Sequence, residues 1–528
     1  MKRFALLALA LAACAQPSAT AGAPHVGVRL VEGAGQDLTP APAGGAATYL
    51  REPHHPEGPL MPPDAFLGEL TLVGEDGKPR ALGAGATNLA GSVLFSPDGQ
   101  WLAYLTHFDF STHTGQLSLV SVAGGEPRAL APGVSFFGFS PDGKNLAYVA
   151  AGRLSLLALA GGEPATVADG VATFEFSADG RAVLYRTRSS DGAALVLAPV
   201  AAGGKAPTPV ARHVADYQFD RKGQAIAYTL ETPDRLPELH LWKGGAERLI
   251  ATAAPSFAFS SDGRYLAFVA GVSASYLEGD TYVVAVDGGA PQRIGKRAGT
   301  YVFSPDGSQL AFLHEYYDRS RTGKLAVWNP GRGTVEVAPF VRLFGWSHRG
   351  GALAWLQTVT RPLYTEQLHL APAAAPAAGR FIGQAIYSFD FSPDDKELLF
   401  KTACVSGGQA CDLMEVPTDA AAAKVTHGPD GGLLPEKAVR VAAGLSDYDF
   451  SPDGHWLWLT FTNPTGHTVD VAVIPNGEWS LPRYVDRGAE PHPRWLAGGK
   501  VAYLVNTPKR PGLYEADPAQ VPAALSHR

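Results

Sequence analysis

The residues best suited to chemistry recur as a short motif of serine, proline, aspartate and glycine. Its four complete copies follow Phe95, Phe139, Phe303 and Phe450. Serine close to aspartate, with a histidine beside some copies, has the residue types of a nucleophile and its base. The same residues also form a tight turn, because proline fixes φ, aspartate bonds back to the backbone and glycine accepts a positive φ. Since a site repeated in every unit determines a fold, we interpret the motif as a turn.

The motif belongs to a repeat that runs along almost the whole chain. Looser copies begin at Phe176, Phe219, Phe259, Trp346 and Phe391, and an eroded copy begins at Trp495. The serine position is occupied by Ser96, Ser140, Ser177, Asp220, Ser260, Ser304, Ser347, Ser392, Ser451 and Leu496. Most neighbouring positions lie 40 to 45 residues apart. This period is typical of a propeller blade of four strands.

One unit shows how these strands are expected to follow one another. Residues 135–140 form an apolar first strand, 141–143 the turn, 145–149 a second strand and 154–159 a third. A short edge strand follows at 164–167, where proline is tolerated. Apolar residues alternate in short runs throughout, and no helical period competes with them. The predicted fold class is therefore all-β, a β-propeller of four-stranded blades.

The number of units bears on how many rings the chain forms. There are ten first strands and eleven sets of outer strands, because 47–50, 69–73 and 76–82 match a second, third and fourth strand. Such an offset is expected when the N-terminal part completes a blade begun elsewhere. Propellers usually have 4 to 8 blades. We therefore expect two tandem rings, over 46–295 and 296–528, with one large ring as the alternative.

The pattern Phe-Ser-Pro-Asp-Gly-x-x-Leu-Ala-Tyr/Phe resembles the repeats of TolB-type propellers, the Pro-Asp variety related to WD40 repeats. The resemblance covers about 46–525. It implies the fold, and it implies little about function, because such blades occur in periplasmic binding proteins and in serine peptidases alike.

The first residues predict export. Lys2 and Arg3 precede a short apolar run that ends in Leu-Ala-Ala-Cys14, which looks like a bacterial lipobox. We expect 1–13 to be a lipoprotein signal peptide, Cys14 to be lipidated and 14–45 to be a flexible tether. Ala15 is not acidic, which by family resemblance points to the outer membrane of a Gram-negative cell. An ordinary secretory signal cleaved after Ala21 is the alternative.

The remaining cysteines and the charge balance agree with an envelope protein. Cys404 and Cys411 are close in sequence and predict a local disulfide in an oxidising compartment. The chain has 43 basic and 50 acidic residues, a net charge of −7, without a basic block. This balance gives no reason to expect nucleic acid as a partner. Contact with a membrane is expected through the lipid anchor alone.

Motifs of known chemistry are absent from the sequence. There is no Gly-x-Ser-x-Gly elbow, no P-loop and no HExxH. The pairs His54–His55 and His107–His113 could bind a metal, but we interpret them as solvated loop residues. The sequence predicts no cofactor, no metal and no catalytic residue.

The variable hairpins between second and third strands remain as candidates. They are expected on one face of the propeller, opposite the Pro-Asp-Gly turns, and loops on a rigid scaffold often carry function. Tyrosine, phenylalanine and arginine are the residue types that anchor interfaces. The candidate partner-binding residues are His107, Phe108, Asp109, Phe110, Tyr276, Glu278, Tyr316, Tyr317, Arg319, Arg321, Arg361 and Tyr364. The alternative is that these are solvated hairpin ends of variable length.

Two functions are compatible with these observations. The first is an envelope lipoprotein whose propeller binds a protein, peptide or glycan, without enzyme activity. The second is a propeller enzyme, a lyase, lactonase or hydrolase, with its site at a ring mouth. The enzyme needs titratable groups from several blades that converge with a metal. Three or more of His107, His113, Glu278, Asp280, Glu315 and Asp318 within ligand distance of one another would favour it. A purely structural role is a third reading.

Overall fold

A computed structural model describes residues 26–523, except 58–60, 189–191, 202–205, 233–235, 273–278, 361–363, 406–409, 420–424, 428–432, 436, 464–466 and 478–480. Cys14, Tyr276, Glu278 and Arg361 lie outside the described residues. The described chain is almost entirely β-strand, with a single short 3-10 helix at Pro518–Gln520 (η2). No helix in it has the length and apolar character that a membrane crossing needs.

The strands form eleven four-stranded blades in the described residues, and we number the blades in chain order. Blade 1 contains β2 (Gly35–Pro40), β3 (Ala47–His54), β4 (Leu67–Val73) and β5 (Pro79–Thr87). Blade 2 contains β6 (Val93–Phe95), β7 (Trp101–Asp109), β8 (Thr114–Ser121) and β9 (Arg128–Phe139), and blade 3 contains β9 again, β10 (Asn145–Ala150), β11 (Arg153–Ala158) and β12 (Ala165–Ala168). Blade 4 contains β13 (Val171–Phe176), β14 (Ala182–Thr187), β15 (Leu195–Pro199) and β16 (Thr208–Ala211).

Blade 5 contains β17 (Val214–Phe219), β18 (Ala225–Leu230), β19 (Glu238–Lys243) and β20 (Ala246–Ala251). Blade 6 contains β21 (Ser256–Phe259), β22 (Tyr265–Ala270), β23 (Asp280–Ala285) and β24 (Gln292–Gly295). Blade 7 contains β25 (Tyr301–Phe303), β26 (Leu310–Tyr317), β27 (Thr322–Asn329) and β28 (Gly333–Trp346), and blade 8 contains β28 again, β29 (Ala352–Val359), β30 (Thr365–Pro372) and β31 (Arg380–Gln384). The long strands β9 and β28 are each the outer strand of one blade and the inner strand of the next.

Blade 9 contains β32 (Ile386–Phe391), β33 (Glu397–Val405), β34 (Ala410–Pro417) and β37 (Val439–Leu445). Blade 10 contains β38 (Asp447–Phe450), β39 (Trp456–Thr462), β40 (Val469–Pro475) and β41 (Arg483–Ala489). Blade 11 contains β42 (Arg494–Trp495), β43 (Val501–Val505), β44 (Gly512–Ala516) and β1 (Val28–Glu32). A hairpin of β35 (Val425–His427) and β36 (Leu433–Pro435) is inserted in blade 9. Its buried Leu434 packs among residues of blades 8 and 9.

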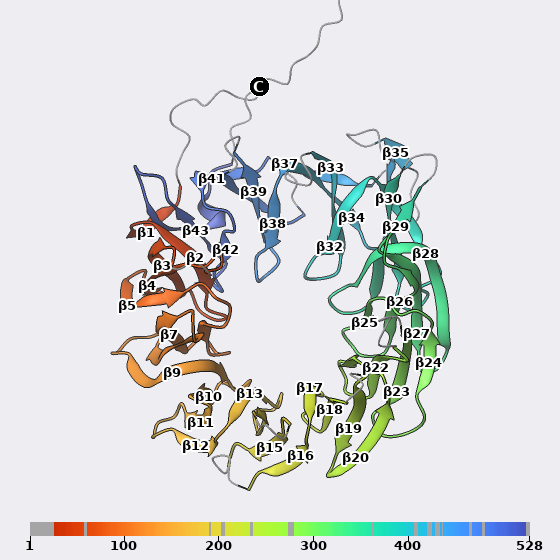
Figure 1. Ribbon diagram of the computed structural model, residues 1–528. Helices are drawn as coiled ribbons and strands as arrows, with labels where there is room; N and C mark the ends of the chain where they lie inside the picture. Colours follow the sequence, from red (N-terminus) through yellow and green to blue (C-terminus); the bar gives the residue numbers. More distant parts are fainter. Residues whose placement is uncertain are drawn as a thin grey trace, which may run out of the picture.

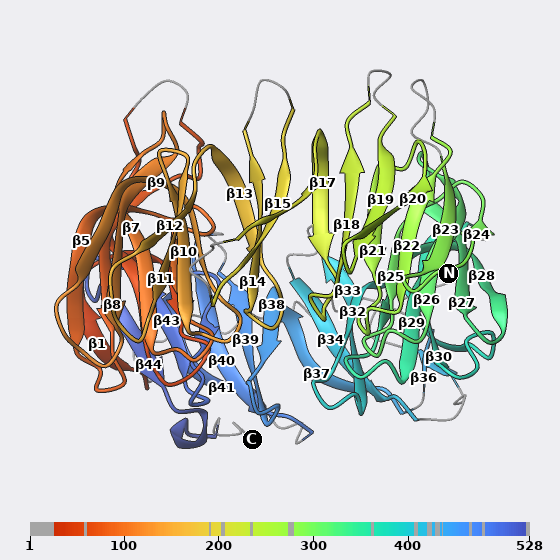
Figure 2. The same cartoon turned by 90° about the horizontal axis from the view of Figure 1, so that it is seen from below.

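The predicted β-propeller is confirmed, and its blades form one ring around a wide central opening (Figure 1). Figure 2 shows the blades side on, with their strands running between the two faces of the ring. Each of eleven hydrophobic clusters in the described residues joins two neighbouring blades, and together they lead once around the ring.

The preferred arrangement of two tandem rings is therefore corrected to the alternative, one large ring. A break near 295 would leave the facing sides of blades 6 and 7 exposed. Instead, Ala267 and Val283 of blade 6 pack in one cluster with Leu310, Phe312 and Trp328 of blade 7. Burying this apolar surface at every blade interface favours a continuous ring.

The N-terminal part also differs from the expected tether over 14–45. Two strands lie inside that range, β1 and β2. The β1 strand pairs with β44 and is the outer strand of blade 11, so the first and last strands that the structure describes meet in one blade. The β2 strand is an eleventh inner strand, which the sequence did not reveal because it lacks the aromatic–serine motif.

Two positions recur in the blades and matter below. The inner-strand residue directly before the turn is Phe or Trp in ten of the eleven described blades, and it packs toward the preceding blade. We call it the inner aromatic position. The second position lies where the chain crosses from one blade to the next. There, left-handed residues precede a buried apolar residue, as Gly133 (φ 64°) precedes Val134. We call it the crossover position.

Candidate functional site

The serine–aspartate turns have the geometry of a fold determinant. Ser304 is buried, its hydroxyl donates to Asp306, and the backbone N–H of Gln309 donates to Ser304 Oγ at 3.0 Å. The same bonds recur in other blades, for example at Ser140 and Ser451. A buried hydroxyl that both donates and accepts within its own turn is not arranged as a nucleophile.

The aspartates of six of these turns have a lowered pKa. In blade 10, the hydrogen bond from the Ser451 hydroxyl, followed by the backbone N–H of His455, lowers the pKa of Asp453 to about 2. In blade 5 the serine is replaced by Asp220, whose carboxylate itself accepts the backbone N–H groups of Gln224 at 2.6 Å and Ala225 at 3.0 Å. Carboxylates bonded in this way brace turns and are poor general bases at neutral pH.

The turns also touch one another around the ring, which restricts their glycines. Gly307 has φ 74°, and a Cβ at this position would lie 2.7 Å from Cγ of Asp262 in the preceding blade. Both the backbone angle and the neighbouring blade therefore require glycine here.

The candidate hairpin of blade 2 is more ordered than the expected irregular loop. Residues 107–109 are part of β7, and the φ of His107, +49°, marks a shift in the pairing of β7 with β8. Phe110 is 9% exposed and meets Phe108 edge-on at 5.1 Å, so these two rings mainly pack on each other. Hydrogen bonds from the hydroxyl and then the N–H of Ser111 lower the pKa of Asp109.

The candidate hairpin of blade 7 presents more side chains to solvent. Tyr316 is half-buried beside the core between blades 7 and 8, whereas Tyr317 is 50% exposed. The guanidinium of Arg297 lies 4.6 Å from the centroid of the Tyr317 ring, a cation–π contact. Arg319 and Arg321 are exposed in the turn and form no ion pair with any residue that the structure describes.

Blade 8 adds Tyr364, which is 69% exposed. Its hydroxyl donates to Glu366 Oε1 at 3.2 Å, and the same oxygen lies 3.3 Å from Nε of Arg342 and 3.0 Å from the hydroxyl of Thr358. These contacts fix the base of the Tyr364 hairpin against β28.

Phe340 completes this region, and the sequence analysis missed it. It occupies the crossover position in β28, where the neighbouring Val341 pairs with Gly323 of β27 and Gln357 of β29. Its ring is 59% exposed and its φ is +55°, a conformation that costs a bulky residue free energy. The equivalent residue of β9 is Gly133, so an alignment of the crossover positions could have found Phe340.

We call Arg297, Tyr317, Arg319, Arg321, Phe340 and Tyr364 the blade 7–8 patch. Arg297 lies between β24 and β25, where the chain enters blade 7, and the other members lie in or between strands β26 to β30. Blades 7 and 8 lie side by side in Figure 1. The blade 2 hairpin lies across the ring from it, near β7. The structure therefore brings together the candidates of blades 7 and 8 and separates them from those of blade 2.

The wall of the central opening carries titratable groups that were not predicted. Burial raises the pKa of Glu175, on β13, to about 7, and Asp216 on the neighbouring β17 also raises it. Partial loss of hydration likewise raises the pKa of Asp390 on β32 and of Asp449 on β38, although both residues keep exposed surface. The ammonium of Lys401 lies nearby and donates to the carbonyl of Ser446 at 2.9 Å.

The groups that a metal-dependent enzyme would need are not assembled in the described residues. Glu315 is paired with Lys324 at 2.9 Å, and Asp280 with Arg293 at 3.2 Å. His107 and His113 belong to blade 2. No group of three His, Cys, Asp or Glu side chains in the described part of the chain could hold a metal ion.

Cys404 and Cys411 are joined by a disulfide bond with their Cα atoms 4.0 Å apart. The bond links neighbouring strands β33 and β34 at the end of their hairpin. It is a local brace, distant in sequence from the blade 7–8 patch.

Neither the family models nor the curated proteins contain a match to this chain. Solved structures similar to parts of it include a eukaryotic initiation factor, at 14% identity and a TM-score of 0.42, covering 68% of this chain and 94% of that one. An oligogalacturonate lyase in complex with manganese has 14% identity and a TM-score of 0.30, over 57% and 93% of the chains. TolB from Acinetobacter baumannii has 14% identity and a TM-score of 0.25, over 51% and 76%.

Proposed function

We propose that this protein is a binding module of the cell envelope, and that the blade 7–8 patch docks an acidic segment of a partner protein. The carrying observation is Phe340. A large aromatic residue is held exposed in a left-handed conformation at a position where several blades, such as those with Gly133 and Gly170, have glycine. Strain of this kind is retained at functional sites. An exposed ring also gains the most when a partner covers it.

The charge of the patch indicates the chemistry of its partner. Arg297, Arg319 and Arg321 lie on a chain whose net charge is −7, and Asp318 is the acidic residue in the same turn. Arginine and tyrosine are typical anchors of interfaces, and a positive patch attracts negatively charged segments. An acidic peptide segment fits these side chains better than a neutral glycan does.

The envelope location rests on the sequence of the first residues. The charged start, the apolar run and Cys14 support export and lipid anchoring. Metabolic labelling with a palmitate analogue tests the anchor. The wild type should be labelled and the Cys14→Ser variant should not, whereas equal labelling of the two would contradict lipidation at Cys14.

Binding is tested with a fluorescent acidic peptide and with membrane proteins captured on the immobilised chain. Phe340→Gly and the double change Arg319→Ala/Arg321→Ala should each weaken peptide binding at least tenfold, and higher salt should weaken it further. His213→Gly is the matched control, because His213 (φ 58°) is an exposed crossover residue of another blade. If the patch variants capture the same partners as the wild type, the patch is not the docking surface.

An enzyme remains the second candidate because of Glu175. A carboxyl group with a pKa of about 7 is suited to general acid–base catalysis, and Glu175 lies on the inner strand β13 within electrostatic reach of Asp216. A Glu175→Gln variant assayed against polysaccharide and lactone substrates tests this function. Activity of the wild type that the variant loses supports catalysis, and no activity in the wild type argues against it.

A further inference from the structure

The inner aromatic position is interrupted at one place in the described ring. Ten blades carry Phe95, Phe139, Phe176, Phe219, Phe259, Phe303, Trp346, Phe391, Phe450 or Trp495 there, and blade 1 carries Pro40. The alignment of Pro40 with them rests on strand register. Pro40 pairs with Ala47 of the second strand as Phe95 pairs with Leu102 and Phe303 with Leu310.

The aromatic rings at this position reach over the inner edge of the preceding blade. The indole N–H of Trp346 donates to the carbonyl of Val302 at 3.1 Å, and that of Trp495 to the carbonyl of Asp449 at 3.2 Å. In each case the acceptor lies on the inner strand of the blade before. A ring at position 40 would correspondingly lie over β42 of blade 11, with the carbonyl of Arg494 in the equivalent place.

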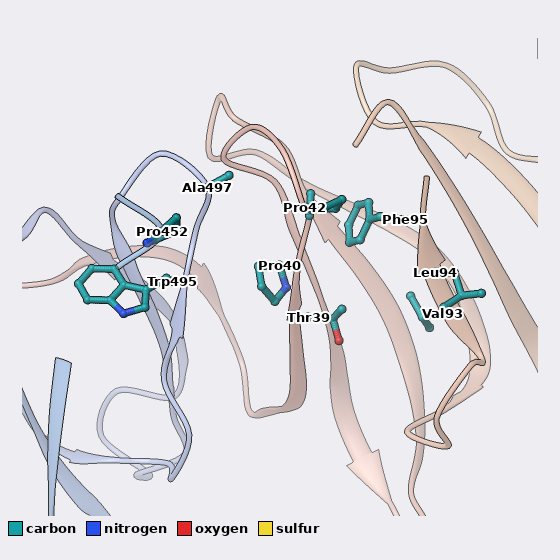
Figure 3. A pocket seen from close by; sticks show the side chains of 10 residues that line it. Thr39, Pro40, Pro42, Val93, Leu94, Phe95, Pro452, Trp495 and Ala497 are labelled. Atoms are coloured by element: carbon teal, nitrogen blue, oxygen red, sulfur yellow. The ribbon is translucent and has the colours of Figure 1, made fainter. Parts of the chain in front are cut away.

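A hollow of about 400 Å³ occurs where this ring is missing (Figure 3). Pro40 lies between Trp495 on one side and Phe95 on the other, and Pro452 and Ala497 lie near Trp495. None of its lining residues is charged. Its volume is in the range of sites for small ligands, and its apolar walls favour a neutral ring.

We propose that this hollow, which we call the blade 1 hollow, binds a small neutral aromatic molecule that carries one hydrogen-bond donor, such as an indole or a phenol. The ring occupies the place of the missing side chain between Trp495 and Phe95. Its donor reaches the carbonyl of Arg494, as the indoles of Trp346 and Trp495 reach theirs. The site is independent of the blade 7–8 patch, which lies on other blades.

The probe is 5-fluoroindole, observed by ¹⁹F NMR during titration with the full-length mature chain. We expect a saturable shift that unlabelled phenol displaces and that fluorobenzoate, an anion, does not. Pro40→Trp restores the repeat inside the hollow and should weaken probe binding at least tenfold. Lys144→Trp, which adds the same ring at an exposed turn of blade 3, should leave it unchanged.

A second variant covers the case in which Pro40→Trp fails to fold. Ala497→Leu narrows the hollow from blade 11 and should also weaken the probe at least tenfold. No saturable shift with the wild type overturns the proposal, and so does undiminished binding to both hollow variants. The tripeptide Ala-Trp-Ala is tested as well. If it binds and free indole does not, the proposal is overturned, because the hollow would then be a peptide-binding site. Loss of acidic-peptide binding in the patch variants has no bearing on these outcomes.

Discussion

Arg510, in the turn between β43 and β44, donates hydrogen bonds from both of its terminal nitrogens to the carboxylate of Asp486 on β41. The Asp486 side chain is 1% exposed, and the pair joins blade 10 to blade 11, which contains the first and last strands that the structure describes. The hydrogen bond to Asp486 raises the pKa of Arg510.

Removing one partner of this pair should weaken the ring at its closure. Arg510→Ala leaves the buried carboxylate of Asp486 without its cationic partner and should cost about 3 kcal/mol of unfolding free energy. Chemical denaturation followed by tryptophan fluorescence measures the loss. Arg264→Ala, which removes an exposed partner of Asp262 in another turn, is the control and should cost less than about 1 kcal/mol. Equal losses for the two would contradict a special role for the pair.

Phe340→Gly should make the protein more stable while it weakens binding. Glycine relieves the left-handed strain, and we expect a gain of about 0.5–1 kcal/mol in unfolding free energy. His213→Gly should give a similar gain without a change in binding. A Phe340→Gly variant that is less stable than the wild type would show that the ring serves packing instead.

Ser304→Ala should lower stability and leave peptide binding intact. The change leaves the N–H of Gln309 without its side-chain acceptor and removes one of the hydrogen-bond donors to Asp306, at a cost of about 1–2 kcal/mol. Thermal unfolding and the peptide titration measure the two properties. Loss of peptide binding by the folded variant would speak against the scaffold interpretation of the repeated serine.

Glu175 should make stability depend on pH. Its folded pKa is about 7, above the ordinary 4.5, so the folded state holds more protons than the unfolded state between these values. Stability should therefore fall as pH rises from about 4.5 to 7 because of this group. Glu175→Gln should remove this part of the dependence, raising Tm above pH 7 and changing it little at pH 4.5. A constant Tm difference across this range would contradict the assignment.

The Cys404–Cys411 bond should stabilise the hairpin of β33 and β34. Closing so short a loop contributes about 2 kcal/mol in the chain-entropy model. The double variant Cys404→Ser/Cys411→Ser should lose this amount. Reduction of the wild type should lower its stability to the same level, and the variant should not respond to reductant.

The architecture could be predicted from the sequence wherever a residue type has one physical role. Ser304 and Gly307 predict a bonded turn and a positive φ, and the structure has both. Phe303 predicts a buried strand, whereas β25 is only half-buried and its Val302 is exposed. The β2 strand escaped because Pro40 and Ala41 replace the aromatic and the serine that mark the repeat. Ring size escaped as well, because it depends on the angle between packed blades, and no single residue encodes that angle.

The candidate site was recognisable only in part. Tyr317 and Tyr364 stand out as aromatic residues in hairpins, and both are exposed. Phe110 has the same appearance in the sequence, but it is buried against Phe108 in its own hairpin. Phe340 lies in the middle of a continuous strand, so a search restricted to hairpins does not find it. The raised pKa of Glu175 could not be predicted either, because it depends on neighbours from another blade.

Because β1 pairs with β44, the ring can close only after the last strand of the chain has been made. Gly35 and Asn506, which are bonded to each other next to this blade, are 471 residues apart in the sequence. The loop entropy of joining them is small once the blades between have stacked, and large before that. The newly made chain therefore passes through an open arc in which two blade faces are not yet packed against a neighbour. A chaperone or protease that distinguishes the open arc from the closed ring would recognise those faces. Removing β1 or β44 would leave the molecule in the open form.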